Sequence, residues 1–266
     1  MELTTEFQKI GTGSSKTYGA ATGYLELWAK YNSQDIAENK SNVSVELRLV
    51  VSGGYIGNYQ ATYWSISGSL SNSGNLGSGE YRSQTLGSKT DYITHDNDGT
   101  KSISFTGEFN PTAWGQTLSV SASATLPTIP RYATVTTSVS NVKEHSVDIS
   151  WTSDVNVDKI RYRIDSGEWV IVEDNVDKSS GTYQITGLDA STNYTIDFDY
   201  RRKDSQQWSF NAGYSSSETI TTLDNVMYIK VNGSWKKATP YIKINGIWKK
   251  ATPYIKVNGV WKEGIN

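Results

Sequence analysis

The sequence predicts an all-β protein. Hydrophobic and polar residues alternate over many short runs, such as GYLELWAKYN, NVSVELRLVVSG and TKSISFTGEFN, and Gly-rich segments separate these runs. No apolar period of 3.6 residues is sustained in residues 1–130, and the aromatic residues are mainly Trp and Tyr, 9 and 17 against 5 Phe. Such alternation and composition are typical of half-buried strands. Residues 1–130 are therefore expected to form an antiparallel, jelly-roll-like β-sandwich.

A second domain is expected over residues 131–225. The two prolines in LPTIPR, at 126–131, predict a stiff boundary before it. HSVDISW predicts a strand that ends at Trp151, and KIRYRIDSGEWVIV predicts two strands around the turn at 165–167.

HSVDISW with its Trp, and LDASTNY leading into a strand, resemble a fibronectin type III domain. The resemblance covers about 95 residues and implies a closing strand at 217–223. It also implies a tyrosine corner, for which the matching positions are Leu188, Thr192 and Tyr194. Ala190 departs from the family pattern, which usually has Pro in that loop. A spacer is the commonest role of such a domain.

The last 41 residues, 226–266, contain a 13-residue repeat, with Tyr and Trp in step in three copies. In each copy an Asn-Gly pair separates two short β-prone runs. A two-residue Asn-Gly loop predicts a hairpin with a type I′ turn, because both central residues of that turn need positive φ. Three tandem hairpins are therefore predicted, and pairing outward from the first turn places Val231 opposite Ser234 and Lys230 opposite Trp235.

Period-two alternation gives the hairpins two different faces. One face is aliphatic and is the expected assembly surface; it comprises Ile229, Val231, Ile242, Ile244, Ile247, Ile255, Val257 and Val260. The other face is the expected ligand-binding surface; it comprises Tyr228, Lys230, Trp235, Tyr241, Lys243, Trp248, Tyr254, Lys256 and Trp261.

Charge is unevenly distributed along the chain. The formal net charge is −2, yet residues 226–266 contain eight Lys and one Glu, whereas residues 131–225 contain nine basic and fifteen acidic residues. A basic tail beside an acidic body favours an anionic partner. A cell-wall glycopolymer, a nucleic acid and the acidic body of a neighbouring subunit all fit. The regular hairpin spacing predicts a flat surface, which disfavours the groove typical of single-strand binding.

Residues that could carry catalysis are sparse. The chain has no Cys and two histidines, His95 and His145, which are both expected to be solvated loop residues. Neither belongs to an HExxH or GxSxG motif, and the acidic residues occur singly, so neither enzyme activity nor a cofactor is expected. The segment 96–99, DNDG, partly resembles a calcium loop but lacks its downstream Glu, and a turn without metal is the preferred interpretation.

The beginning of the sequence, MELTTEFQKIG, has neither a basic region nor an apolar core. No signal peptide is therefore expected. No run approaches the roughly 18 apolar residues of a membrane span, so no membrane insertion is expected.

Residues 1–131 resemble a family of tail-associated minor structural proteins of siphophages that infect Gram-positive bacteria. The resemblance rests on the alternating strands followed by HDNDGTKSI and then LPTIPR. Terminal YIKVNG-W repeats are also common at the ends of such phage proteins. These resemblances imply a virion component near the host-facing end of the tail, made in the host cytoplasm.

The expected function is that of a non-enzymatic virion protein of the tail or tail tip that supports attachment to the host surface. Forty-one cysteine-free residues are too few to bury the aliphatic hairpin face, so it is expected to pack on a second copy or on another virion protein. A trimer is expected if the virion site has threefold symmetry. The alternatives are a decoration protein, anchored to capsid or tail by its repeats without a receptor role, and a glycan hydrolase with no nominated carboxylate.

Overall fold

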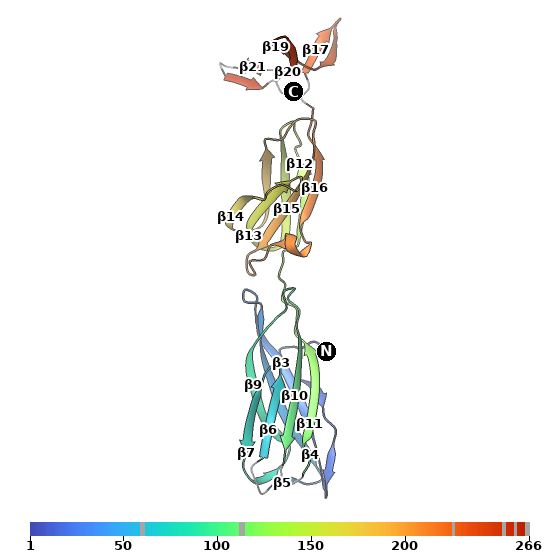
Figure 1. The fold of residues 1–266 in the computed structure, drawn as a ribbon, viewed down its shortest axis with the longest axis vertical. Coiled ribbons are helices and arrows are strands. Elements are labelled where there is room, and N and C mark those ends of the chain that lie inside the picture. The colour runs from blue at the N-terminus through green and yellow to red at the C-terminus, as the bar shows by residue number, and fades with distance from the viewer. Residues whose placement is uncertain (59–61, 112–114, 225–226, 252–253, 258–259, 264–266) are drawn as a thin grey trace. The chain divides into compact units, whose positions relative to one another are not determined.

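The computed structural model describes residues 1–58, 62–111, 115–224, 227–251, 254–257 and 260–263 (Figure 1). Within these residues the regular elements are β-strands and one 3₁₀ helix, Ser209–Ala212, which confirms the all-β prediction. No helix in this described part is long and apolar enough to cross a membrane. The chain divides into two compact units, Met1–Arg131 with Asp204–Gln207, and Tyr132–Lys203 with Trp208–Asn266. The separate boundary expected near residue 225 stays a prediction.

One layer of the first unit is a five-stranded antiparallel sheet. Its strands are β1 (Gln8–Thr12), β2 (Lys16–Tyr18), β3 (Ala21–Asp35), β4 (Lys40–Ser52) and β9 (Gln84–Thr94). They run in the order β1-β3-β4-β9, and β2 pairs with β3. Alternate residues of β3 and β4, such as Leu25, Leu27, Val45 and Leu47, are buried, as the sequence alternation predicts.

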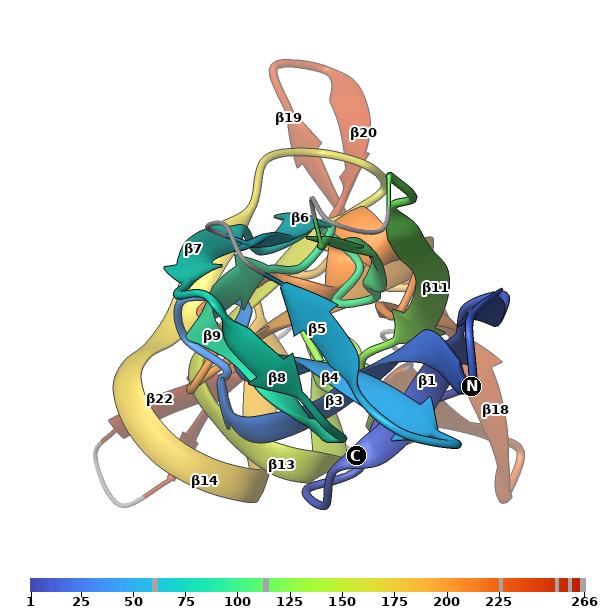
Figure 2. The ribbon, with the colours of Figure 1, turned by 90° about the horizontal axis from the view of Figure 1, so that it is seen from below.

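The other layer is a four-stranded antiparallel sheet in the order β11-β10-β6-β7. Its strands are β6 (Thr62–Gly68), β7 (Asn72–Leu76), β10 (Ser102–Asn110) and β11 (Leu118–Thr125). A further pair, β5 (Ile56–Asn58) and β8 (Gly79–Tyr81), forms a small sheet of its own. Figure 2, seen from below, shows β5 and β8 at the near end of the unit.

The core of the first unit lies between these two sheets, so the predicted antiparallel β-sandwich is present. Buried side chains from both layers form one cluster, with Leu47 from one sheet and Phe105 and Phe109 from the other. Trp64 closes the core near β7 and β9, where two glycines leave room for its ring. A Cβ at Gly87 would lie 2.0 Å from the Trp64 indole, and one at Gly74 would lie 2.8 Å from it. Any larger residue at Gly87 would displace the indole.

The second unit contains the strands β12 (Val135–Ser140), β13 (Ser146–Ile164), β14 (Val170–Thr186), β15 (Asn193–Arg202) and β16 (Ser216–Thr221). The first part of β13 pairs with β12 and with the end of β14, whereas its last part pairs with the start of β14 and with β15. The pairing shifts between Thr152 and Lys159, so β13 passes from one layer to the other. With β15 also paired to β16, this is the strand arrangement of a fibronectin type III sandwich.

The strand expected to end at Trp151 instead continues to Ile164, because the backbone stays extended through the shift between layers. The predicted turn after it is present, with positive φ at Asp165 and Ser166. The closing strand is β16, at 216–221 rather than 217–223.

The tyrosine corner implied by the family resemblance is also present. Tyr194 Oη accepts a hydrogen bond from the Asp189 backbone N–H at 2.8 Å, and Leu188 is buried beside this corner. Thr192 Oγ1 donates to the Ala190 carbonyl at 3.0 Å. The loop therefore keeps its internal bonds although Ala190 replaces the usual Pro.

The C-terminal strands form three separate two-stranded antiparallel sheets. The first hairpin is β17 (Met227–Val231) with β18 (Ser234–Ala238). The second is β19 (Tyr241–Ile244) with β20 (Ile247–Lys250), and the third is β21 (Tyr254–Val257) with β22 (Val260–Glu263). One hairpin therefore corresponds to each copy of the 13-residue repeat.

Candidate functional site

Asn-Gly turns set the geometry of the C-terminal hairpins. Asn232 and Gly233 have φ of 51° and 85°, and Asn245 and Gly246 have φ of 51° and 82°. Positive φ at both central positions is what a type I′ turn requires. The turn of the third hairpin, at 258–259, lies outside the described residues.

These turns fix the predicted register. In the first hairpin Val231 pairs with Ser234 and Lys230 with Trp235. In the second and third hairpins, Lys243 pairs with Trp248 and Lys256 with Trp261. Because paired residues share a face, the first and second hairpins each place one Lys and one Trp side by side on the same surface.

The face with Tyr, Trp and Lys is open to solvent in the first two repeats. Trp235 is 69% exposed and Trp248 is 64% exposed. Lys230 Nζ lies 5.9 Å from the centre of the Trp235 ring, and Lys243 Nζ lies 5.7 Å from that of Trp248. These distances are those of a cation–π contact. Tyr241 and Tyr254 are exposed as well, while the side chains of Tyr228 and Trp261 lie outside the described residues.

The aliphatic face is equally open. Its described members are all exposed: Ile229, Val231, Ile242, Ile244 and Ile247. The predicted members Ile255, Val257 and Val260 have side chains outside the described residues. The register also pairs Lys236 with Ile229 and Lys249 with Ile242, so each of these isoleucines has a lysine beside it. In the second hairpin the aliphatic face is therefore apolar at the Ile244–Ile247 pair beside the turn and carries a lysine at its next pair.

Exposure of this kind is concentrated in the repeats. Of the seventeen large hydrophobic residues that are exposed in the described chain, nine lie in the hairpins. A single two-stranded hairpin is marginally stable in water, and three or more strands are needed for independent stability. Apolar side chains on unsupported hairpins favour a partner that covers them.

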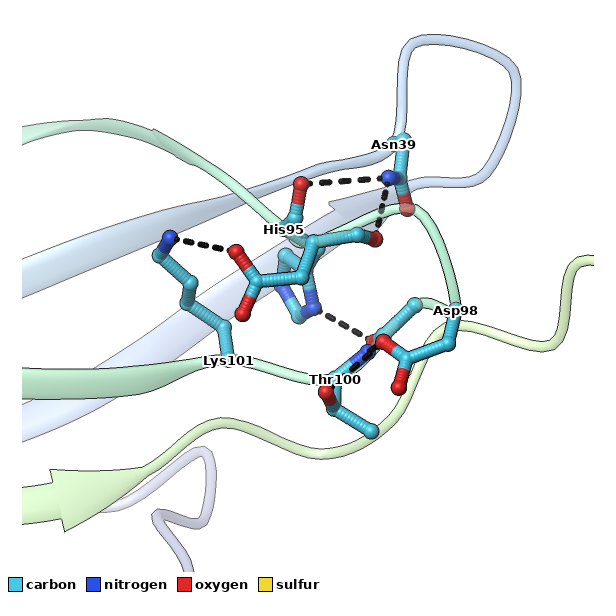
Figure 3. Close-up of polar contacts among 7 residues, drawn as sticks. Asn39, His95, Asp98, Thr100 and Lys101 are labelled. Carbon is cyan, nitrogen blue, oxygen red and sulfur yellow. Dashed lines mark hydrogen bonds and ion pairs between the residues drawn. The ribbon is translucent and has the colours of Figure 1, made fainter.

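His95 is not the solvated loop residue that the sequence predicts. It is 4% exposed, its Nδ1 lies 2.7 Å from the Gly99 carbonyl, and its Nε2 lies 2.8 Å from Ser41 Oγ. Asn39 Nδ2 donates to the carbonyls of His95 and Asp96, which ties the loop to the start of β4 (Figure 3). The prediction failed because the histidine is covered by a strand more than fifty residues earlier in the chain. His145, in contrast, is exposed, and its Nδ1 lies 2.7 Å from the Leu188 carbonyl.

The carboxylates of Asp96 and Asp98, which follow His95, bind groups of the same turn. Asp98 Oδ1 accepts hydrogen bonds from the backbone N–H and the hydroxyl of Thr100, and these bonds lower the pKa of Asp98 (Figure 3). Asp96 forms an ion pair with Lys101 at 3.0 Å. In the described part of the chain, no group of three or more His, Asp or Glu residues is placed to hold a metal ion.

An arginine–aromatic stack in the second unit has no counterpart in the sequence predictions. Arg161 Cζ lies 4.0 Å from the Trp208 ring centre and 4.5 Å from that of Trp169. Arg163 Cζ lies 4.7 Å from the Trp169 ring centre and 4.6 Å from that of Phe210.

Both guanidinium groups of this stack are also paired with acids of β15. Arg161 binds Asp199 at 2.6 Å, and Arg163 binds Asp197 at 2.8 Å. Both arginines have their ion-pair and ring partners within the second unit, so we interpret the stack as a structural element and not as a binding site. The arginine spacing in KIRYRID places both side chains on one face of a strand, but two of the aromatic partners, Trp208 and Phe210, come from a segment more than forty residues later.

Comparison of the sequence with models of protein families identifies the family of this chain. The model of a family described as "Siphovirus protein of unknown function (DUF859)" matches residues 19–234. The chain belongs to this siphovirus family. The match includes most of both sandwiches and ends within the first hairpin, so the second and third repeats of this siphovirus protein lie beyond it. Comparison with curated protein sequences gave no significant match.

Among solved structures, the siphovirus protein is similar to a two-domain fibronectin type III segment of chicken tenascin, with 13% sequence identity and a TM-score of 0.30. That alignment covers 73% of this chain and 97% of the tenascin chain. The siphovirus protein is also similar to the central fibronectin III array of RIM-binding protein, with 10% identity and a TM-score of 0.27. The second alignment covers 84% of this chain and 76% of the other.

Proposed function

We propose that this siphovirus protein is a non-enzymatic structural component of the virion, placed in the tail or at its tip, and that it supports attachment to the surface of a Gram-positive host. Membership of a siphovirus family supports a role in the particle. The observation that carries the proposal is the set of exposed aromatic and aliphatic residues on the three C-terminal hairpins.

The aliphatic face is assigned to assembly. Ile242, Ile244 and Ile247 are exposed on a sheet of only two strands, and burying such side chains stabilises by about 25 cal/mol per Å² of apolar surface. A second copy of the same hairpins, or another virion protein, provides the complementary surface. A trimer is the assembly proposed if the virion site is threefold symmetric.

The face with Tyr, Trp and Lys is assigned to recognition of an anionic cell-wall glycopolymer. Exposed rings offer flat apolar surface to sugar units, and adjacent lysines attract negative charge. The Lys243–Trp248 pair provides both features at one position, and the repeat supplies the same pairing in each hairpin. Several weak contacts from one chain would then act together.

The second candidate is a structural or decoration protein that the repeats anchor to the capsid or tail, with no direct receptor role. The exposed aliphatic face supports both candidates equally. It fits docking on another virion protein whether or not the chain also binds a host receptor.

Truncation of the chain after residue 225 in the phage separates the two candidates. Virions are purified, the protein in them is quantified, and adsorption to host cells is measured. Normal incorporation with reduced adsorption supports attachment. Lost incorporation supports anchoring. Unchanged incorporation together with unchanged adsorption would overturn both assignments.

A further inference from the structure

The outer face of the β11-β10-β6-β7 sheet has an unusual composition. The four strands contain neither Lys nor Arg, and Glu108 is their one acidic residue. Charged residues make up 20% of the whole chain, so this surface is poor in charge by comparison. Its outward positions carry small polar residues, chiefly Ser, together with one aromatic residue, Tyr63, and one carboxylate, Glu108.

A hollow of about 490 Å³ lies on this face and is lined by Tyr63, Trp64, Ser65, Ser73, Gly74, Asn75, Glu108 and Asn110. The strand register arranges its polar side chains in two rows across three strands. Asn110, Tyr63 and Asn75 form one row, and Glu108, Ser65 and Ser73 form the next. Neighbouring strands are about 4.8 Å apart and successive residues on one face roughly 7 Å apart, so the six side chains span an area comparable to one sugar ring.

None of these six side chains forms a side-chain hydrogen bond or ion pair with another residue of the described chain. Further along the same face the polar groups do pair, as with Thr106 Oγ1 and Ser121 Oγ at 3.0 Å. The hollow therefore presents two amides, two hydroxyls, a phenol and a carboxylate, which together offer both donors and acceptors.

The chemistry of the hollow selects one class of ligand. An anion is disfavoured, because Glu108 is present and the four strands carry no basic residue. A metal ion is disfavoured, because one carboxylate with amide and hydroxyl groups is a weak ligand set. Tyr63 is 56% exposed and supplies aromatic surface, while the groups around it suit a partner with many hydroxyls.

We infer that this hollow binds a neutral saccharide unit, with the Tyr63 ring against the sugar and with Asn75, Asn110 and Glu108 hydrogen-bonded to its hydroxyls. This site goes beyond the role proposed for the C-terminal repeats and is independent of it. It lies in the first unit and differs from the repeats in charge, so the two surfaces are suited to different ligands.

The test uses the full chain and the methyl glycosides of glucose, galactose, N-acetylglucosamine and rhamnose as probes, with binding followed by ligand-observed NMR and calorimetry. At least one glycoside is expected to bind. Tyr63→Ala and Asn75→Ala are each expected to weaken that binding tenfold or more. The matched control is Tyr92→Ala, which removes a tyrosine that is 50% exposed on β9 of the other sheet, and it is expected to bind as the wild type does.

Thermal unfolding of each variant checks that it is folded, which is expected because both tyrosines lie on the surface. A chain with Trp235, Trp248 and Trp261 all replaced by Ala is expected to keep its saccharide binding, so failure of this site and failure of the repeats are distinguishable. Absence of binding for all four glycosides, or equal affinity of wild type and Tyr63→Ala, would overturn the inference.

Discussion

Lys243 and Trp248 face each other across the second C-terminal hairpin, with the lysine Nζ 5.7 Å from the centre of the indole ring. Trp248 nevertheless remains 64% exposed, so most of the ring is available to a partner. The first hairpin repeats the pair with Lys230 and Trp235. Each of these hairpins thus presents an aromatic surface with a positive charge beside it, on a framework determined by its Asn-Gly turn.

Replacement of Ile242, Ile244 and Ile247 by Thr is expected to reduce the solution mass of the full chain to that of a monomer. Thr preserves β-propensity but removes the apolar surface that self-assembly would bury. Sedimentation equilibrium measures the mass. Ile171→Thr is the control, because Ile171 is similarly exposed on β14 and its replacement should leave the mass unchanged. A variant that keeps the wild-type mass, or a wild type that is itself monomeric, contradicts self-assembly through this face.

His95→Gln is expected to reduce the pH dependence of stability of the first unit. Burial lowers the pKa of His95 from its usual 6.5, so the unfolded chain binds a proton more readily than the folded chain. The contribution of His95 to the free energy of unfolding is then fully present above pH 6.5 and is lost as the pH falls below that value. Calorimetric scans at about pH 7.5 and about pH 5.5 should show a larger fall in the unfolding midpoint for wild type than for the variant. Equal falls in the unfolding midpoint would show that His95 does not contribute to the pH dependence of stability.

Gly99→Ala is expected to destabilise the first unit by at least about 2 kcal/mol. Gly99 has φ of 84°, and an added Cβ would lie 1.9 Å from the Ile129 carbonyl oxygen. Gly115→Ala is the matched control, since Gly115 has φ of 60° and, its two chain neighbours aside, no atom of the described residues lies within 4 Å of its Cβ position. Urea unfolding of both variants separates the conformational cost from the steric clash. Similar losses for the two would argue against close contact between the Gly99 turn and the segment at Ile129.

Arg161→Ala is expected to destabilise the second unit more than Arg163→Ala. The Asp199 side chain is fully buried, whereas that of Asp197 is 16% exposed. Burial raises the pKa of Asp199 despite hydrogen bonds from Phe210 N–H and Arg161, so loss of Arg161 leaves a buried carboxylate without its cation. Breaking a buried pair in this way costs about 3–5 kcal/mol. Urea unfolding gives the free energy of unfolding of both variants. Equal losses for Arg161→Ala and Arg163→Ala would contradict the larger role expected for Arg161.

The features that were predictable from sequence are those encoded locally. Period-two alternation identified the strands of the first sandwich, and Asn232-Gly233 with Asn245-Gly246 fixed the hairpin register, because turn type alone determines which residues pair. Tyr194 and Leu188 were placed correctly through their family resemblance. The pairing of Lys236 with Ile229 follows from the same register, yet it makes the aliphatic face more basic than the isoleucines alone indicate.

The features that the sequence did not reveal depend on contacts between distant segments. His95 is buried because Ser41 and the turn at Gly99 enclose it, and no local pattern distinguishes it from an exposed loop histidine. Arg161 is stacked between Trp169 and Trp208, which come from separate segments of the chain. The polar hollow at Tyr63 likewise needs the register of three strands, two of which are far apart in sequence.

Binding of the full chain to intact host cells is the most direct test of the role proposed for the repeats. The variant replaces Trp235, Trp248 and Trp261 by Ala. The control is Tyr55→Ala, which removes an exposed aromatic residue of the first unit. The fraction of protein that sediments with the cells is measured for each chain. The expected result is loss of cell binding in the triple Trp variant with unchanged binding in the control. Unchanged binding of the triple Trp variant would contradict recognition through the hairpin face that carries Tyr, Trp and Lys.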